Sequence, residues 1–215
     1  DIIQPVHCVR DLGLYTMSIH STMSMRDHVT RLTSTCFGVL RTIRCIRRNL
    51  SRRALAMLVT CFVFVRLDYC NATFIGLPHC DLNRIQAVQN AAVRLVAGAS
   101  RFDHVTPLLR ERHWLPVHLR VAYKMAVIVY KCLAATSADY LTALTRPPVS
   151  TTTLRLRSAD TRCLHVPRTR TGYGDRAFSV AGPRLWNSLP DSVKSATLLG
   201  TFKQRLKTHL FRSLD

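Results

Sequence analysis

Residues 84–116 have the sequence RIQAVQNAAVRLVAGASRFDHVTPLLRERHWLP, and this stretch decides the fold. Apolar residues recur here with the spacing of one α-helical face, namely Ile85, Val88, Ala92, Leu95 and Val96. We predict a helix over residues 82–97. Asp81 stands where an N-cap would, and Gly98 stands where a left-handed glycine would end the helix.

The second half of the stretch predicts a shorter helix and a corner. Thr106 followed by Pro107 has the pattern of an N-cap and a proline at the first helical position. Trp114 is large and apolar, so we expect it to anchor the corner to the core.

Four further helices are predicted from apolar spacing, over residues 25–48, 51–69, 117–133 and 201–211. The helix over residues 25–48 carries a regular apolar seam, made of Val29, Leu32, Cys36, Val39, Ile43 and Ile46. Residues 54–65 are apolar without interruption and predict a core helix that is hydrophobic on all sides. We therefore expect a mainly α fold built around a three-helix bundle.

The two ends of the chain have a different character. Residues 1–23 are mixed, and VRDLGLY around Gly13 favours a short β element. Residues 145–176 hold prolines, threonines and seven arginines, which is typical of a basic, partly irregular segment. Gly182-Pro183 favours a turn. We expect three regions: a β element at 1–23, a helical bundle at 24–144, and a basic linker with a C-terminal helical segment at 145–215.

The charge of the chain favours a polyanionic partner. The 215 residues have a formal net charge of +19, and arginine supplies 26 of the 31 basic residues. Such an excess repels itself in a compact state, and arginine's planar fork suits phosphate. We therefore expect nucleic acid as the partner. A basic surface with no specific purpose is the alternative.

Several classes of site and location are not favoured. The eight cysteines form no zinc-ligand spacing, so we expect no metal and predict mostly buried, reduced, intracellular thiols. No signal-peptide pattern is present at the N-terminus. The apolar run of 12 residues at 54–65 is shorter than the roughly 20 that a membrane span requires. We expect a nuclear or cytoplasmic location and no membrane partner.

Arginine stripes supply the first candidate nucleic-acid-binding residues. Arg41, Arg44 and Arg48 recur at helical spacing away from the apolar seam, and Arg52 follows closely. This face has no alternating carboxylates, so we favour contact with phosphates over a merely solvated face.

Two later segments supply the other candidates. Residues 117–133 place Arg120, Lys124 and Lys131 opposite the apolar face, flanked by Tyr123 and Tyr130. These residues could hold a backbone and stack a base, or the tyrosines could pack at the edge of the core. In the basic segment, guanidinium groups suit phosphate, and the candidates there are Arg155, Arg157, Arg168 and Arg170.

Several segments of the sequence resemble one family. RLDYCN at 66–71, RIQAVQNAAVRLV at 84–96, and DHVTPLLRERHWLPVHLRVAYK at 103–124 resemble the region that follows the catalytic palm in reverse transcriptases of LINE-type, jockey-like non-LTR retrotransposons. The resemblance continues in LRSAD at 156–160, VPRTRT at 166–171, GDRAFSVAGPRLWNSLP at 174–190 and TFKQRLKTHLF at 201–211. The chain departs from it at 135–140, where the family has Gly-x-Ala-Pro-x-Tyr and this sequence has Ala135 and Ala138 in place of the glycine and the proline.

The resemblance implies a helical thumb that packs against a template-primer duplex, with residues 1–23 as a primer-grip-like remnant of the palm. Polymerisation by this family relies on two adjacent aspartates, and none of the 11 aspartates here are adjacent. We therefore expect no catalytic residue, no cofactor and no small-molecule substrate. The expected partner is RNA or an RNA/DNA duplex. The alternatives are an inert retrotransposon relic and a helical protein-interaction module, and a role at a membrane surface is weaker.

Overall fold

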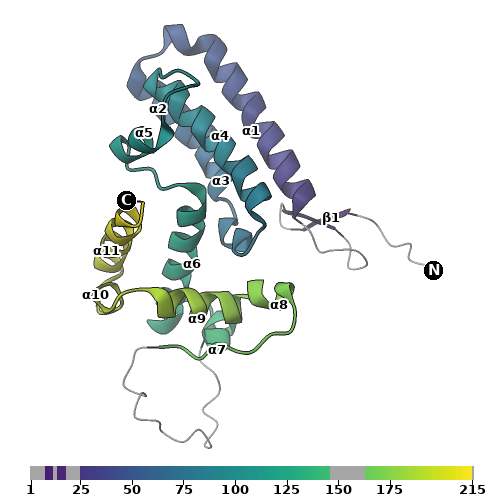
Figure 1. Cartoon of the computed structure of the whole chain (residues 1–215), viewed down its shortest axis with the longest axis vertical. Coiled ribbons are helices and arrows are strands. Elements are labelled where there is room, and N and C mark those ends of the chain that lie inside the picture. The colour runs from purple at the N-terminus through teal and green to yellow at the C-terminus, as the bar shows by residue number, and fades with distance from the viewer. Residues whose placement is uncertain (1–7, 12–13, 18–24, 146–162, 215) are drawn as a thin grey trace, which may run out of the picture. The chain divides into compact units, whose positions relative to one another are not determined.

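A computed structural model describes residues 8–11, 14–17, 25–145 and 163–214. The chain divides into two compact units (Figure 1). The first unit comprises residues 1–71 and 77–117, and the second comprises residues 72–76 and 118–215. The boundary near residue 117 differs from the division expected at residue 144.

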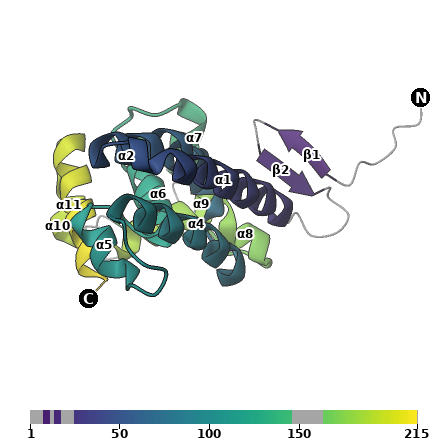
Figure 2. The same cartoon turned by 90° about the horizontal axis from the view of Figure 1, so that it is seen from above.

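The first unit is a helical bundle with a short hairpin. β1 (Cys8–Asp11) and β2 (Leu14–Met17) pair antiparallel, with Cys8 opposite Met17 (Figure 2). The long helix α1 (Arg26–Ile46) is followed by the 3-10 turn η1 (Arg47–Asn49). A continuous helical segment then contains α2 (Arg52–Val59), the π-turn η2 (Thr60–Phe64) and α3 (Val65–Asp68). α4 (His79–Ala97) and α5 (Val105–Glu111) complete the unit.

The second unit is also helical. It contains most of the 3-10 turn η3 (Asn71–Phe74), the long helix α6 (Val117–Leu133) and α7 (Asp139–Thr145). After the gap come α8 (Gly172–Arg176), α9 (Phe178–Ser188), α10 (Asp191–Lys194) and α11 (Leu199–Arg212). The prediction of a mainly α fold with a helical bundle is confirmed.

The predicted central helix forms the middle of the first core. α4 lies beside α1 (Figure 1), and all five residues of its predicted apolar face are buried. Gly98 ends the helix with φ 74°, a left-handed conformation, as the sequence predicts. The ring of Trp114 lies 4.3 Å from that of Phe64, measured between centroids, so the corner is anchored as expected.

Both N-cap predictions in this stretch are wrong. α4 begins three residues earlier than expected, with Pro78 as N-cap, and Asp81 is a buried first-turn residue 3.7 Å from the guanidinium of Arg84. α5 begins at Val105 with His104 as N-cap, so Thr106 and Pro107 lie inside its first turn.

The prediction of Gly182-Pro183 as a turn is also wrong, because both residues are buried within α9. There the position of a Cβ on Gly182 would lie 3.0 Å from Cγ2 of Val129, so glycine permits close packing of α9 on α6.

The helix over residues 54–65 is not buried on all sides. Leu55, Val59 and Val63 face the core, while Met57, Phe62 and Val65 are 59%, 48% and 61% exposed. The segment packs on α1 and α4 with one side only, which leaves the opposite side in solvent. The expectation of mostly buried cysteines fails for the described residues as well, because Cys36 and Cys132 are buried and Cys45, Cys61, Cys80 and Cys163 are exposed.

Candidate nucleic-acid interface

The arginine stripe that begins on α1 and ends in η1, called the α1 stripe below, is exposed along its whole length. Arg41, Arg44 and Arg48 are all exposed, while Cys36, Leu40 and Ile43 turn the other side of the helix to the core. At about 1.5 Å per residue, the stripe from Arg41 to Arg48 spans about 10 Å. The phosphates of one strand advance about 3.4 Å each along the axis of a B-form duplex, so a stripe parallel to that axis matches about three of them.

An aromatic side chain also lies on this face and was missed by the sequence analysis. Phe37 is 40% exposed and precedes Arg41 by four residues and Arg44 by seven. These spacings place Phe37 on the same helix face as both arginines, with Arg41 as its neighbour one turn away. The same periodicity that identifies the arginine stripe could have identified Phe37. An exposed ring at one end of an arginine stripe can stack on an unpaired base.

The charge of the α1 stripe is not compensated by carboxylates. No carboxylate of the described residues forms an ion pair with Arg41, Arg44 or Arg48. Arg44 lies in the last turn of α1, where the helix dipole favours a cation. The helix dipole is therefore a structural reason for an arginine at position 44. It does not extend to Arg41, which lies farther inside the helix.

Arg52 and Arg53 lie at the N-terminal end of α2, where the helix dipole disfavours positive charge. The hydroxyl of Ser51 caps α2 by accepting a hydrogen bond from the amide of Ala54 at 3.2 Å. The first turn of α2 contains no acidic residue, and the two exposed arginines face the positive end of the helix dipole. Their charge therefore opposes the stability of α2 unless an anion is bound nearby.

The basic face of α6 is only partly available in the second unit. Lys124 is exposed, whereas Arg120 and Lys131 are half-buried. Tyr130 is buried and stacks on Phe202, so for this residue the edge-of-core alternative holds. Tyr123 is half-buried, and burial raises the pKa of its hydroxyl.

Residues 168–176 offer a second exposed basic segment. Arg168 and Arg170 are exposed, and neither pairs with a carboxylate of the described residues. The nearby carboxylate of Asp175 accepts hydrogen bonds from Thr169 at 2.7 Å and from Arg184 at 2.9 Å, and these two bonds lower its pKa. Asp175 is thus engaged by other groups and does not neutralise Arg168 or Arg170. The remaining candidates, Arg155 and Arg157, lie outside the described residues.

The candidates fall into two groups, one in each unit. The first group contains Arg41, Arg44, Arg48 and Arg52, and the second contains the α6 residues with Arg168 and Arg170. Within the described part of the chain, no three His, Cys, Asp or Glu side chains are placed to hold a metal ion. None of the described helices has the length and apolar character needed to cross a membrane.

Comparison with known proteins gives no relative from which residue roles could be transferred. No protein-family model matches the chain, and no curated protein or solved structure matches it significantly.

Proposed function

We propose that this chain is a non-catalytic fragment of the RNA-directed DNA polymerase of a non-LTR retrotransposon, and that it binds RNA or an RNA/DNA duplex in the nucleus or cytoplasm. The observation that carries the binding proposal is the exposed α1 stripe, whose three arginines form no ion pair with a described carboxylate. The assignment to the retrotransposon class rests on the sequence resemblance, and the resembling segments lie in both units.

Phosphate neutralisation is the mechanism that suits this surface. Arginines on an exposed helix face displace the counterions condensed on a nucleic acid, which gives an affinity that depends strongly on salt but little on sequence. Phe37 adds a ring on which an unpaired base can stack. In a polymerase of the resembling family, such a surface would hold the template-primer duplex.

The decisive experiment measures binding to an RNA/DNA duplex and to a scrambled single strand by fluorescence anisotropy from about 50 to 200 mM salt. The triple variant Arg41→Gln, Arg44→Gln, Arg48→Gln should lower affinity and flatten the log-log salt dependence by about 2 to 3, since each lost phosphate contact removes about 0.7 to 0.9. Glutamine is preferred to glutamate because a carboxylate near the end of α1 would also destabilise the helix.

The matched control removes the same number of positive charges elsewhere. Arg101→Gln, Lys203→Gln, Lys207→Gln changes net charge equally without touching the α1 stripe. This control variant should keep most of the dependence of affinity on salt concentration. Equal losses in the two triple variants would show that binding follows net charge alone, and a folded protein without salt-dependent binding would refute the proposal.

A second candidate function is contact with another protein. The segment from α2 to α3 exposes three large apolar side chains, namely Met57, Phe62 and Val65. Apolar surface of this kind favours protein association. Self-association that is insensitive to salt, in a protein that does not bind RNA, would select this alternative.

A further inference from the structure

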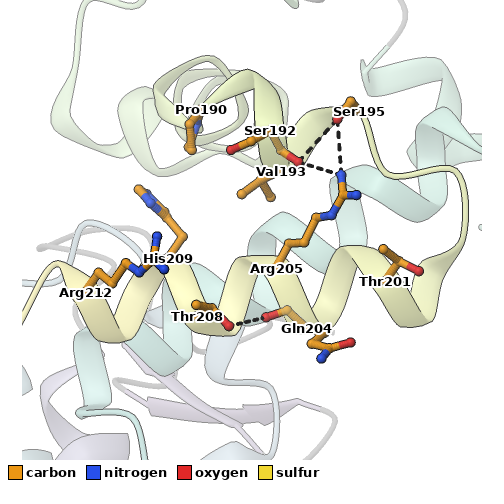
Figure 3. A pocket seen from close by; sticks show the side chains of 10 residues that line it. All are labelled: Pro190, Ser192, Val193, Ser195, Thr201, Gln204, Arg205, Thr208, His209 and Arg212. Carbon is orange, nitrogen blue, oxygen red and sulfur yellow. Dashed lines mark hydrogen bonds between the residues drawn. The ribbon is translucent and has the colours of Figure 1, made fainter.

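A polar groove in the second unit lies between α11 and the segment that contains α10. It has a volume of about 610 Å³, and its walls are formed by α11 on one side and by Pro190, Ser192, Val193 and Ser195 on the other (Figure 3). Ligand pockets of proteins commonly have volumes of this size. None of the candidate residues from the sequence analysis lines it, so the groove is a separate feature of the molecule.

Three basic side chains share the α11 wall of this groove. Arg205, His209 and Arg212 follow one another at four and three residues, so they lie on one helix face, next to the face that is buried in the core. The residues that line the groove include no carboxylate. Within the described residues, none of the three basic groups forms an ion pair. The groove therefore concentrates positive charge in a concave surface, which strengthens its field.

The opposite wall holds Arg205 in a fixed orientation. Its Nη1 donates to the carbonyl oxygen of Ser192 at 2.8 Å and to the hydroxyl of Ser195 at 3.2 Å (Figure 3). The Ser195 hydroxyl in turn donates to the carbonyl oxygen of Ser192 at 3.2 Å. A guanidinium has five N–H donors, so these two bonds leave donors for a ligand while they limit the freedom of the side chain.

The chemistry of the lining selects a small polyanion. Guanidinium groups, an imidazole and the hydroxyls of Ser192 and Thr201 can all donate hydrogen bonds to oxygen. Pro190 and Val193 are the apolar side chains of the lining, and the lining contains no aromatic ring on which a base could stack. A phosphomonoester carries about −1.5 to −2 charges at pH 7, more than the single charge of a backbone phosphodiester, and three strong acceptor oxygens.

We propose that the groove between α10 and α11 binds the terminal phosphomonoester of a nucleic-acid strand. This inference rests on the proposed nucleic-acid binding and extends it from the strand's backbone to its end. A terminal phosphomonoester carries more negative charge than a backbone phosphodiester, so it gains more from several donors that line one basic groove. Two arginines give bidentate phosphate contacts, and the hydroxyls serve the remaining phosphate oxygen and the sugar.

The test compares short RNA strands that differ only in a 5′-phosphate or a 5′-hydroxyl, with the fluorophore at the other end, and a second pair that differs at the 3′ end. The full chain should bind one phosphorylated end about tenfold more tightly than the matching hydroxyl end. Arg212→Gln, which removes a side chain with no hydrogen bond or ion pair to a described residue, should reduce this preference several-fold. Arg205→Gln with Arg212→Gln should abolish it.

The control variant Lys203→Gln with Lys207→Gln removes two charges from the same helix outside the groove and should keep the end preference. Equal affinity for phosphate and hydroxyl ends, with salt-dependent binding retained, would overturn the groove assignment alone. Loss of all binding in the unmodified protein would instead overturn the proposed function. A third measurement compares the melting temperature of the protein with inorganic phosphate and with a phosphorylated strand. If inorganic phosphate raises the melting temperature as much as the strand does, the ligand is free phosphate and the strand-end proposal fails.

Discussion

Tyr130 of α6 stacks on Phe202 of α11 with ring centroids 4.3 Å apart. Its hydroxyl donates to the carbonyl oxygens of Ala196 at 3.1 Å and Thr197 at 2.8 Å. This contact fastens the start of α11 to α6 and uses the ring that could otherwise have stacked on a base. Tyr130 thus belongs to the core of the second unit.

Tyr130→Phe should lower the free energy of unfolding by about 1 to 2 kcal/mol, because the carbonyl oxygens of Ala196 and Thr197 lose their donor while the ring stacking remains. RNA affinity should not change. Urea unfolding followed by tryptophan fluorescence measures the first effect, and anisotropy measures the second. Tyr140→Phe is the control, since Tyr140 is 69% exposed and its loss of a hydroxyl should not alter stability. Unchanged stability in Tyr130→Phe would contradict the role assigned to these hydrogen bonds.

Ala135 adopts a conformation that favours glycine. It has φ 52°, and the next residue, Thr136, donates from its amide to the carbonyl oxygen of Lys131 at 2.9 Å, which closes the end of α6. The resembling family has glycine at this position. Ala135→Gly should therefore raise the free energy of unfolding by about 1 kcal/mol.

The control for this substitution is Ala122→Gly within α6, which should lower stability by about 1 kcal/mol, since glycine is unfavourable inside a helix. Thermal or urea unfolding of the three proteins gives the comparison. A stabilising Ala135→Gly would also support the relic alternative, because it would show that the present residue is worse for folding than the one the family has. A destabilising Ala135→Gly would contradict the strain inferred here.

The buried histidine of α1 should make stability depend on pH. Burial lowers the pKa of His28 below its ordinary value near 6.5. Near pH 6 the unfolded chain therefore binds more protons at this position than the folded chain, so stability rises with pH and falls on acidification. The free energy of unfolding should fall from pH 7.5 to pH 5.5. His28→Leu should flatten this fall, whereas His104→Gln, at an exposed position, should leave it unchanged. An identical pH profile in His28→Leu would count against this assignment.

Helix positions follow from local sequence where periodicity and a stop signal agree. The bounds of α6 match the prediction at both ends, and Gly98 ends α4 as expected, because a side-chain period and a left-handed glycine are local properties. The N-terminus of α4 was misplaced, since Asp81 has the right residue type for a cap but lies inside the helix. The exposed side of α2 to α3 was missed because an unbroken apolar run does not indicate which side meets a neighbour.

Contacts between distant residues could not be predicted from one sequence. Gln89 is fully buried, and its Nε2 donates to the carbonyl oxygen of Leu115 at 2.8 Å, across 26 residues. Gln86 accepts from the amide of Val117 at 2.8 Å in the same way. The α10–α11 groove has the same origin, since Ser192 and Ser195 meet Arg205 only after α11 has packed on the core. The α1 stripe was visible in advance because Arg41 and Arg44 lie on α1 and Arg48 follows at helical spacing in η1.

The two arginines at the start of α2 should oppose stability and favour binding. Arg52 is the first residue of the helix, and its charge faces the positive end of the helix dipole. Arg52→Glu should raise the free energy of unfolding by about 0.5 to 1 kcal/mol, because a carboxylate in the first turn is favourable. The same change should weaken RNA binding and reduce the salt slope by about 1. Arg101→Glu is the control: the residue lies outside any helix, so the same change in charge should neither stabilise the protein nor lower RNA affinity as strongly. Opposite shifts in stability and affinity for Arg52→Glu would show that the arginine is kept for binding at the expense of the helix. If both quantities fell together, its role would be structural, and the interface would be restricted to α1.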